Sequence, residues 1–578
     1  MNQITAPRTD PVYNAHGYLT KVPEAAIRPF IERHTKPGDT VLDPFAGSGM
    51  TGVAAFILGR NAELSDISVL GRHIGENLLR VVEPKRLLLE EARVTAAAQE
   101  QIGSYYLASC GKCGKRSPFG KIVWSYVYAC PNCSHELVYY ELLEAHRWRK
   151  GGVCPSCTEP FQRRRAKRVG EKPVLMHLSC AECGNKEPRV LTDEDLRLST
   201  SADRSPLRKR TPDLPIGPDR EMYRRSALRT HGHTTTASFF SPRNAIALTA
   251  LHQAILETKD QDLRNKLLFA FTAILPRASK RYQWHPKRPL NAQNQTYYIA
   301  PIFYEWNVFE LFHRKVAAAL RAQAHVLEQS GTDTLFQRSA HARYTVASAD
   351  SLKHLPDASI DYVFTDPPFG SNLFYSDMSL FQEAWLGSVT DPRREAVVFT
   401  DRARNASSAK TYEDILSGAL RECWRVLKPG KTLSIVFSNS RGEVWAMLQR
   451  AIRASGFTVE PDDIALLNKG QRSVKGLTSG TEHVVTLDLV ITLRRAKRGA
   501  LPHAKPVASA RQQIRELLGT ASPRDLTTPS HAYLHVIRSA VRENFDLQSL
   551  HLSEVLAALR SMGFAVNQRT GGLVRERT

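Results

Sequence analysis

Two segments that lie far apart in the chain share one pattern. In each, a short apolar strand is followed by a turn whose residues can bind a ligand or take part in a reaction. Residues 40–49 read Thr-Val-Leu-Asp-Pro-Phe-Ala-Gly-Ser-Gly, and residues 361–370 read Asp-Tyr-Val-Phe-Thr-Asp-Pro-Pro-Phe-Gly. The glycines of the first turn let the backbone approach a cofactor closely. The acid, proline carbonyl and aromatic ring of the second turn can hold a planar heterocycle that carries an amino group. Together the turns predict one active site that methylates an exocyclic amine of a nucleobase.

Strands and helices alternate around these turns, which predicts an α/β fold with a doubly wound, mostly parallel, Rossmann-like sheet. The expected helices cover 22–34, 51–58 and 411–426, and the expected strands cover 40–42, 61–65, 344–347, 362–365, 432–438 and 484–493. The pattern stops between residues 85 and 340. We therefore expect a large insertion between the second and third strands of the sheet.

Changes in composition divide the chain into five parts. Residues 1–90 and 336–496 form the two halves of the sheet domain, with the glycine motif in the first half and the acid-proline motif in the second. Residues 105–195 carry the cysteines. Residues 196–335 combine a linker with a helical and aromatic segment that we expect to recognise the target. Residues 497–578 form a small helical appendage.

Eight of the nine cysteines occur in Cys-x-x-Cys pairs, a pattern that indicates metal binding in a reducing compartment rather than disulfides. The paired residues are Cys110 and Cys113, Cys130 and Cys133, Cys154 and Cys157, and Cys180 and Cys183. Taken in chain order, the first two pairs would hold one zinc ion and the last two pairs another, in two zinc ribbons. Four thiolates leave no open coordination position, so we expect both Zn²⁺ ions to be structural.

The formal net charge of +22 favours a polyanionic partner, above all nucleic acid. A basic run, Arg163 to Arg168, and a second one, Arg147 to Lys150, predict a surface on the zinc ribbons that contacts phosphates, although a solvated charge run is the plain alternative. The chain has no apolar run that could cross a bilayer and no secretory signal at its start, so we expect a cytoplasmic protein without a membrane partner.

Four motifs resemble those of the S-adenosylmethionine-dependent amino-methyltransferases of DNA. They are Thr20-Lys21-Val22-Pro23, Asp43-Pro44-Phe45-Ala46-Gly47-Ser48-Gly49, Asp366-Pro367-Pro368-Phe369 and Phe374-Tyr375-Ser376-Asp377. Within this class the chain is similar to adenine-specific DNA methylases that contain a zinc ribbon, over about residues 10–495. The resemblance implies a methyltransferase fold, S-adenosylmethionine as cofactor, and double-stranded DNA whose target base flips out of the duplex. Restriction-modification, phage defence and epigenetic regulation all stay open, as do the partner proteins that they would involve.

The resemblance also assigns roles to single residues. The cofactor site would comprise Thr20, Lys21, Asp43, Pro44, Phe45, Gly47, Gly49, Asp66 and Asp350. Within it, Asp66 would bind the ribose hydroxyls and Asp350 the adenine amino group of the cofactor, although each acid is alternatively a helix cap. The catalytic motif would comprise Asp366, Pro367, Pro368 and Phe369. Asp366 and the Pro367 carbonyl would accept hydrogen bonds from the target amine, while Phe369 would stack on the base.

The chemistry of the target agrees with this motif. An exocyclic amine is a poor nucleophile because its lone pair delocalises into the ring, and two acceptors on its hydrogens increase its electron density. Methyl transfer then needs mainly positioning and electrostatic stabilisation. Asp366, rather than serine or threonine, favours adenine N6 over cytosine N4. The alternatives are an N4-cytosine DNA methyltransferase, a guanine-N2 RNA methyltransferase with a similar motif, and a non-catalytic zinc-ribbon protein that binds nucleic acid.

Overall fold

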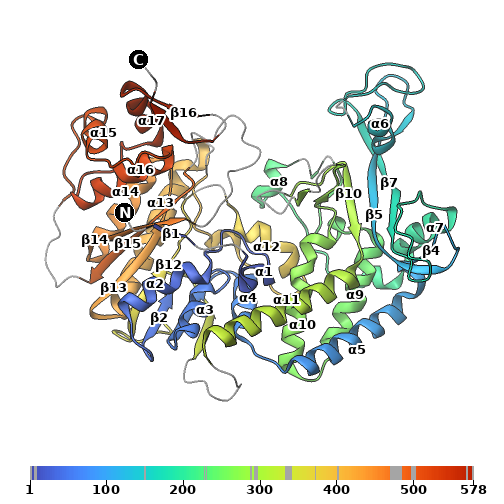
Figure 1. Ribbon diagram of the computed structural model, residues 1–578, viewed down its shortest axis with the longest axis horizontal. Helices are drawn as coiled ribbons and strands as arrows, with labels where there is room; N and C mark the ends of the chain where they lie inside the picture. Colours follow the sequence, from blue (N-terminus) through green and yellow to red (C-terminus); the bar gives the residue numbers. More distant parts are fainter. Residues whose placement is uncertain are drawn as a thin grey trace.

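The computed structural model describes residues 3–5, 9–148, 151–226, 228–229, 231–286, 290–291, 297–331, 341–370, 373–399, 402–468, 485–495, 503–567 and 570–575. Within these residues an eight-stranded sheet organises one half of the molecule (Figure 1). In spatial order its strands are β1 (Gln3–Thr5), β14 (Phe457–Asn468), β15 (Asp488–Arg495), β13 (Leu427–Phe437), β12 (Ile360–Thr365), β2 (Thr40–Asp43), β3 (Asn61–Asp66) and β11 (Ala342–Val346).

The sheet is mostly parallel, as the sequence predicts. β13, β12, β2, β3 and β11 run in one direction, and β15 pairs antiparallel with both β13 and β14. Because the carboxyl ends of parallel strands meet at one edge of a sheet, Asp43, Asp66 and Thr365 lie at the same edge. The two halves of the sheet domain therefore form one structure, although the insertion separates them in the chain.

Side chains alternate between the two faces of the sheet, and each face supports its own core. On β12, Tyr362 and Phe364 pack with the helices of one face and Val363 with those of the other. The first face is covered by α2 (Glu24–His34), α3 (Met50–Ile57), α4 (Val69–Leu79) and α11 (Val308–Gln329). The second face is covered by α13 (Arg402–Val426) and α14 (Gly442–Ser455). Because successive side chains of β12 point to opposite faces, its apolar residues contribute to the core on both sides of the sheet.

β14 is a strand that the sequence pattern did not predict. Its exposed middle contains Glu460-Pro461-Asp462, and its register with β15 shifts between Val459 and Ile464. Because of this irregularity, the alternation of inward and outward side chains does not run continuously through the strand, and the sequence pattern does not reveal it. The strand expected at 484–493 begins at Asp488, and Val484 lies outside the described residues.

The insertion leaves the sheet after α4 and returns through α11 to β11. Its helices are α5 (Pro84–Ile102), α6 (Tyr139–Ala145), α7 (Asp193–Ser201), α8 (Glu221–Arg225), α9 (Pro242–Leu256) and α10 (Gln261–Ala278). Its strands are β4 (Leu107–Ser109), β5 (Arg116–Ala129), β6 (Glu136–Val138), β7 (Lys167–Leu178), β8 (Tyr282–Gln283), β9 (Leu290–Asn291) and β10 (Ile302–Trp306). Figure 1 shows the β5–β7 pair projecting from the body of the molecule, with α6 at its far end.

The last part of the chain packs on the second face of the sheet domain (Figure 1). Its elements are α15 (Ala510–Gly519), α16 (Pro529–Arg542), α17 (Leu552–Ser561), β16 (Phe564–Val566) and β17 (Leu573–Arg575). Buried side chains such as Ile514 and Tyr533 share one apolar cluster with Trp445 of α14. At the other end of the chain, the short helix α1 (Pro11–Ala15) lies beside α11. Among the described helices, none combines the length and apolarity needed to cross a membrane.

Candidate active site and cysteine clusters

The glycine turn and the acid-proline turn meet at the carboxyl edge of the sheet. β2 and β12 pair in parallel, with Val41 opposite Tyr362 and Leu42 opposite Val363. One step further, the Thr365 hydroxyl donates a hydrogen bond to Asp43 Oδ1 over 2.9 Å. Asp366 follows Thr365 directly, so this bond fixes the start of one motif against the start of the other.

Asp43 is a positioning residue within this junction. Besides Thr365, its carboxylate accepts from the Thr51 hydroxyl over 2.6 Å and from the Phe45 amide over 3.1 Å. Burial raises the pKa of Asp43 to about 7, against the opposing effect of these hydrogen bonds. The carboxylate oxygens of Asp43 thus accept hydrogen bonds from the turn, from α3 and from β12. It shapes the predicted cofactor loop from beneath.

The glycine turn is held from two neighbouring strands, β3 and β11. The Gly47 amide donates to Asp66 Oδ2 at the end of β3 over 2.8 Å, and the Tyr344 hydroxyl of β11 donates to the Gly47 carbonyl over 2.6 Å. Gly47 and Gly49 have φ angles of +48° and +76°, a region that side chains disfavour. The turn therefore requires glycine at both positions and leads directly into α3.

Helix α4 packs on this turn through two glycines that the sequence reading did not single out. A Cβ on Gly71 would overlap the Gly47 carbonyl oxygen, and one on Gly75 would lie 2.8 Å from the Tyr344 ring. Residues four apart lie on one face of a helix, so the four-residue spacing of Gly71 and Gly75 is the sequence signal that could have predicted this contact. The contact brings the amino end of α4 close to the cavity.

A cavity opens above the two turns, and most of the predicted cofactor residues line it. Its walls include Tyr18, Thr20, Lys21, Asp43, Pro44, Phe45, Ala46, Gly47, Ser48, Asp66, Ser68, Ser348, Ala349, Asp366, Pro368, Tyr375, Thr390, Arg394 and Glu395. Asp66 accepts from the Gly47 and Ser68 amides, each over 2.8 Å, and burial raises its pKa. Gly49 does not line the cavity but caps α3 below it.

Asp350 lies outside this cavity. Its side chain is exposed and stands beside Gly418 of α13, whereas the preceding Ser348 and Ala349 line the wall.

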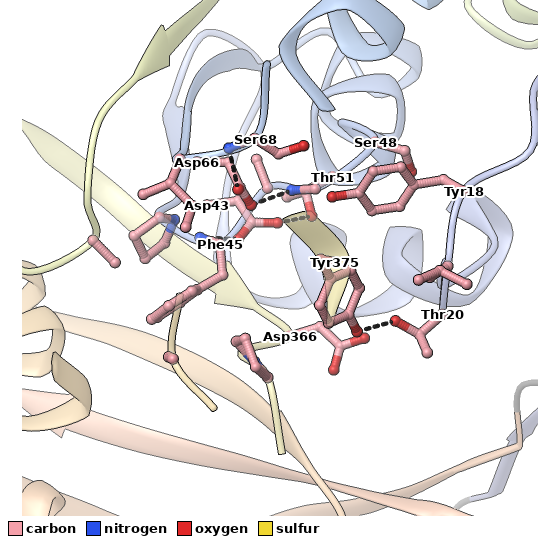
Figure 2. Close-up of a pocket in the computed structure, with 18 of the residues that line it drawn as sticks. Tyr18, Thr20, Asp43, Phe45, Ser48, Thr51, Asp66, Ser68, Asp366 and Tyr375 are labelled. Carbon is pink, nitrogen blue, oxygen red and sulfur yellow. Dashed lines mark hydrogen bonds between the residues drawn. The ribbon is translucent and has the colours of Figure 1, made fainter. Parts of the chain in front are cut away.

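Thr20 and Lys21 close the cavity from the N-terminal side in different ways. The Thr20 hydroxyl bonds the Tyr375 hydroxyl over 2.6 Å, and Figure 2 shows this bond next to the Asp366 carboxylate. Lys21 instead directs its amine to the carbonyls of Tyr13 and His16, the latter at 2.8 Å, at the end of α1. Burial lowers the pKa of Lys21 to about 7.

A smaller cavity adjoins the first one on the other side of Asp366. It is lined by Thr20, Asp366, Pro367, Pro368, Phe369, Leu373 and Tyr375. Thr20, Asp366, Pro368 and Tyr375 line both cavities, so the Asp366 side chain stands at their junction. The acid therefore faces two spaces at once, one above the glycine turn and one bounded by prolines and aromatic rings.

The acid-proline turn is fixed by side chains from the second face of the sheet. The Tyr412 hydroxyl donates to the Pro368 carbonyl over 2.7 Å, and the Asn439 amide donates to the Phe369 carbonyl over 2.8 Å. The Phe369 ring packs edge-on against Phe437, with 5.4 Å between ring centroids. These contacts hold Pro368 and Phe369 on the sheet side of the turn, so that Pro367 faces the small cavity.

Two acids beyond the predicted set, one buried and one half-buried, hold α12 (Tyr375–Glu383) in place. Glu395 accepts from the Tyr375 amide and from the Ser376 hydroxyl, the latter over 2.6 Å, and burial raises its pKa to about 7. Glu383 accepts from the amides of Leu70 and Thr390, which ties α12 to the start of α4. No motif marks these acids, because their partners come from distant parts of the chain.

The cysteines form two quartets, but not the ones expected from chain order. Sγ atoms of Cys110 and Cys183 lie 3.7 Å apart, and those of Cys113 and Cys180 lie 3.6 Å apart. The other quartet joins Cys130 to Cys157 at 3.7 Å and Cys133 to Cys154 at 3.6 Å. The expected grouping of the first two pairs and of the last two pairs was therefore wrong.

The β5–β7 ladder explains the nested grouping. The strands run antiparallel, with Phe119 opposite Leu178 and Ala129 opposite Lys167. The pair before β5 thus meets the pair after β7 at one end of the ladder, and the two inner pairs meet at the other end. Four thiolates at about 2.3 Å from one Zn²⁺ would have sulfurs about 3.8 Å apart in a tetrahedron. The observed separations are compatible with zinc in both quartets.

The basic run that leads into β7 divides into two kinds of residue. Arg168 is engaged inside the protein, since its guanidinium bonds Glu171 over 2.9 Å and lies 4.2 Å from the Tyr126 ring centroid. Arg164, Arg165 and Lys167 are exposed. Arg149 and Lys150, at the end of the second predicted basic run, lie outside the described residues.

Comparisons with known proteins match the half of the site that carries the glycine motif. Residues 5–83 match the family N6_N4_Mtase, described as DNA methylase, which confirms the predicted resemblance for this segment. The type II methyltransferase M.MjaII of Methanocaldococcus jannaschii is 32% identical over 99 residues, which cover 17% of this chain and 19% of that protein. The match thus spans about a fifth of that relative's length.

Solved structures resemble the chain only weakly. The protein TTHA0409 of Thermus thermophilus is 18% identical over 31% of this chain and 58% of that chain, with a TM-score of 0.16. The cyclase SpnF is 14% identical over 31% of this chain and 63% of that chain, also with a TM-score of 0.16. At these TM-scores the likeness supports no statement about function.

Proposed function

We propose that this chain is an S-adenosylmethionine-dependent DNA methyltransferase that methylates the exocyclic N6 of a flipped adenine. The observation that carries the proposal is the junction at Asp366, where a cavity above the glycine turn meets a smaller cavity bounded by prolines and rings. A methyl donor in the first space and a nucleobase in the second would meet at this carboxylate. The DNA methylase match over residues 5–83 supports the donor side.

The residues of the larger cavity fit S-adenosylmethionine, which supplies an electrophilic methyl group on a sulfonium sulfur. The walls carry the carboxyl groups of Asp43, Asp66, Asp366 and Glu395. Asp66, at the end of β3, would accept hydrogen bonds from the ribose hydroxyls, and the Pro44–Gly47 backbone would pass along the methionine part. The Ser348–Ala349 wall, rather than the exposed Asp350, would face the adenine ring of the cofactor.

Asp366 would act on the target amine. Its carboxylate and the Pro367 carbonyl would each accept a hydrogen bond from one amine hydrogen, which turns the nitrogen lone pair toward the first cavity. Methyl transfer would leave the amine with a positive charge, which Asp366 would stabilise. The amine then releases one proton, which Asp366 can accept. Asp43 takes no part in these steps but keeps Asp366 in register through Thr365.

The small cavity would receive the base outside the duplex. Phe369, Leu373 and Tyr375 supply apolar surface that replaces the lost base stacking. An acid at position 366 favours adenine N6 on the resemblance given above. N4-cytosine methylation of DNA and guanine-N2 methylation of RNA use related geometry, so the product must decide among them.

The test is methyl transfer from labelled S-adenosylmethionine to duplex DNA, with the modified base identified by mass spectrometry. We expect N6-methyladenine. Asp366→Ala should lower the rate by at least about a hundredfold while cofactor binding stays unchanged, because the carboxylate acts on the target amine. Asp414→Ala is the matched control, since Asp414 is an exposed acid paired with Lys410 on α13.

Three outcomes contradict the proposal. N4-methylcytosine as product would overturn the choice of base, and transfer to structured RNA but not to duplex DNA would overturn the substrate. Full activity of Asp366→Ala would remove the assigned catalytic role.

A further inference from the structure

Aromatic rings and cations lie together on one face of β5, β8 and β10. This face of the insertion's sheet is opposite the face that packs on the main core. On β10, Phe303 joins that main core, whereas Ile302 and Tyr304 face a separate cluster on the other side. Trp306 packs against this second cluster. We name Lys121, Arg277, Tyr282, Tyr304 and Trp306 the aromatic–cationic array.

The cations of the array are held flat against its rings. Lys121 Nζ lies 4.8 Å from the Tyr304 ring centroid and 4.9 Å from that of Trp306. The Arg277 guanidinium lies 4.2 Å from the Trp306 centroid and 4.9 Å from that of Tyr282. Two positive charges therefore share one indole ring, and both side chains are fixed rather than free to sample solvent.

These two charges have no counterion in the part of the chain that the structure describes. No carboxylate there lies within ion-pair distance of Lys121 or Arg277, and Glu310 on the adjacent α11 is already paired with Arg314 over 2.9 Å. Burial and then the charges of Arg277 and Arg314 lower the pKa of Lys121. Within the described residues, Trp306 Nε1 and Arg277 Nε also donate to no acceptor. The array thus carries positive charge without a carboxylate among its residues, and two of its donor atoms are buried without a partner.

Two residues of the array directly follow, in the sequence, residues that line a cavity beside the candidate active site. Pro276 and Arg281 line a cavity together with Tyr18 and Tyr375. Those two tyrosines also line the candidate cofactor cavity. Arg277 and Tyr282 are the next residues along the chain after Pro276 and Arg281. A molecule that reaches the site past Tyr375 would therefore pass close to the array.

We propose that the aromatic–cationic array is a docking surface for the phosphate backbone of duplex DNA beside the flipped base. Phosphate oxygens supply the negative charge that the array lacks, and fixed cations bind them with little loss of side-chain entropy. The inference rests on the proposed function only in taking duplex DNA as the substrate. It assigns to this face the positioning of the duplex, not the reading of its sequence.

The test measures binding of a fluorescent duplex of about 30 base pairs by anisotropy at several salt concentrations, without cofactor. Lys121→Gln combined with Arg277→Gln removes two charges and keeps most of the packing stems. Loss of two phosphate contacts should reduce the slope of log K against log salt by about 1.8 and weaken binding about tenfold or more at low salt. Lys36→Gln with Arg511→Gln, both exposed and outside the array, removes the same charge and should leave the slope unchanged.

Unchanged cysteine-bound zinc and an unchanged melting temperature would show that the double variant is folded. If it is not, Lys121→Gln alone decides, with an expected slope change of about 0.9. A slope equal to that of the control variant would overturn the inference, and so would tighter competition by single-stranded RNA than by duplex DNA. Binding is read without methyl transfer, so failure of the proposed function would appear separately, as absent product from a protein that still binds DNA through the array.

Discussion

Replacing Cys110 and Cys180 together by serine should cost the protein one zinc ion, whereas replacing Cys110 and Cys130 should cost both. The prediction follows from the nested quartets, in which Cys110 and Cys180 serve the same site and Cys130 serves the other. Grouping in chain order predicts the reverse result for each double variant. The pair of variants therefore separates the two arrangements without further structural work.

The expected effect is all-or-none at each site. Sulfur separations of 3.6 and 3.7 Å match the edge of a zinc–thiolate tetrahedron, about 3.8 Å. A structural zinc contributes apparent binding energies on the order of 10–16 kcal/mol, and a site with two of its four thiolates missing loses most of that. The variant that empties only the Cys110 quartet should retain one zinc per chain at the far end of the β5–β7 ladder.

Zinc content per chain, measured by mass spectrometry after purification without added metal, decides the matter. Cys423→Ala is the control, because Cys423 is buried on α13 in a different core and lies outside both quartets. It should keep two zinc ions. If Cys110→Ser with Cys180→Ser loses both ions while Cys110→Ser with Cys130→Ser keeps one, the nested arrangement is wrong.

Two further predictions concern the junction of the turns. In the folded state Asp43 keeps its proton up to its pKa of about 7, whereas in the unfolded chain it releases the proton at about pH 4. The contribution of Asp43 to stability is therefore fully present below about pH 4 and is lost as the pH rises from there through 7. Relative to Asp43→Asn, the wild type should lose about 2–3 kcal/mol of unfolding free energy between about pH 5 and pH 8 in urea titrations, and a constant difference would contradict the assigned burial. Gly71→Ala should push α4 away from the Gly47 carbonyl, weaken S-adenosylmethionine binding in calorimetry and cost about 1–3 kcal/mol of stability. Gly170→Ala, where a Cβ meets nothing within 4 Å, is its control, and equal cofactor affinity of Gly71→Ala and wild type would show that this contact does not shape the loop.

Much of the sheet domain could be predicted because its signals are local. An apolar run such as Val41-Leu42 followed by Asp43 and a glycine turn reads as a strand entering a cofactor loop whatever lies around it. The insertion was visible as a break in the alternation of strands and helices. The two turns were expected to share a site, and β2 and β12 are adjacent in the sheet.

The roles of single acids were less accessible, because a carboxylate's role depends on what surrounds it. Asp43 belongs to the predicted loop, yet its oxygens are occupied by Thr51, Thr365 and the turn itself. Asp350 has an exposed position outside the cavity, and Glu395, which no motif marks, lines it.

By itself the sequence determined most strands of the sheet domain, where the glycine and acid-proline turns stand, and that eight cysteines act in pairs. Those properties depend on side-chain period and turn chemistry within a few neighbouring residues. Only the tertiary structure decided which cysteine pairs share a site, that Gly71 meets Gly47, and that Lys121 and Arg277 lie on one indole ring. Spacing along the chain counts residues, whereas these contacts depend on which strands and helices pack together, and that choice is made by the buried surface of the whole fold.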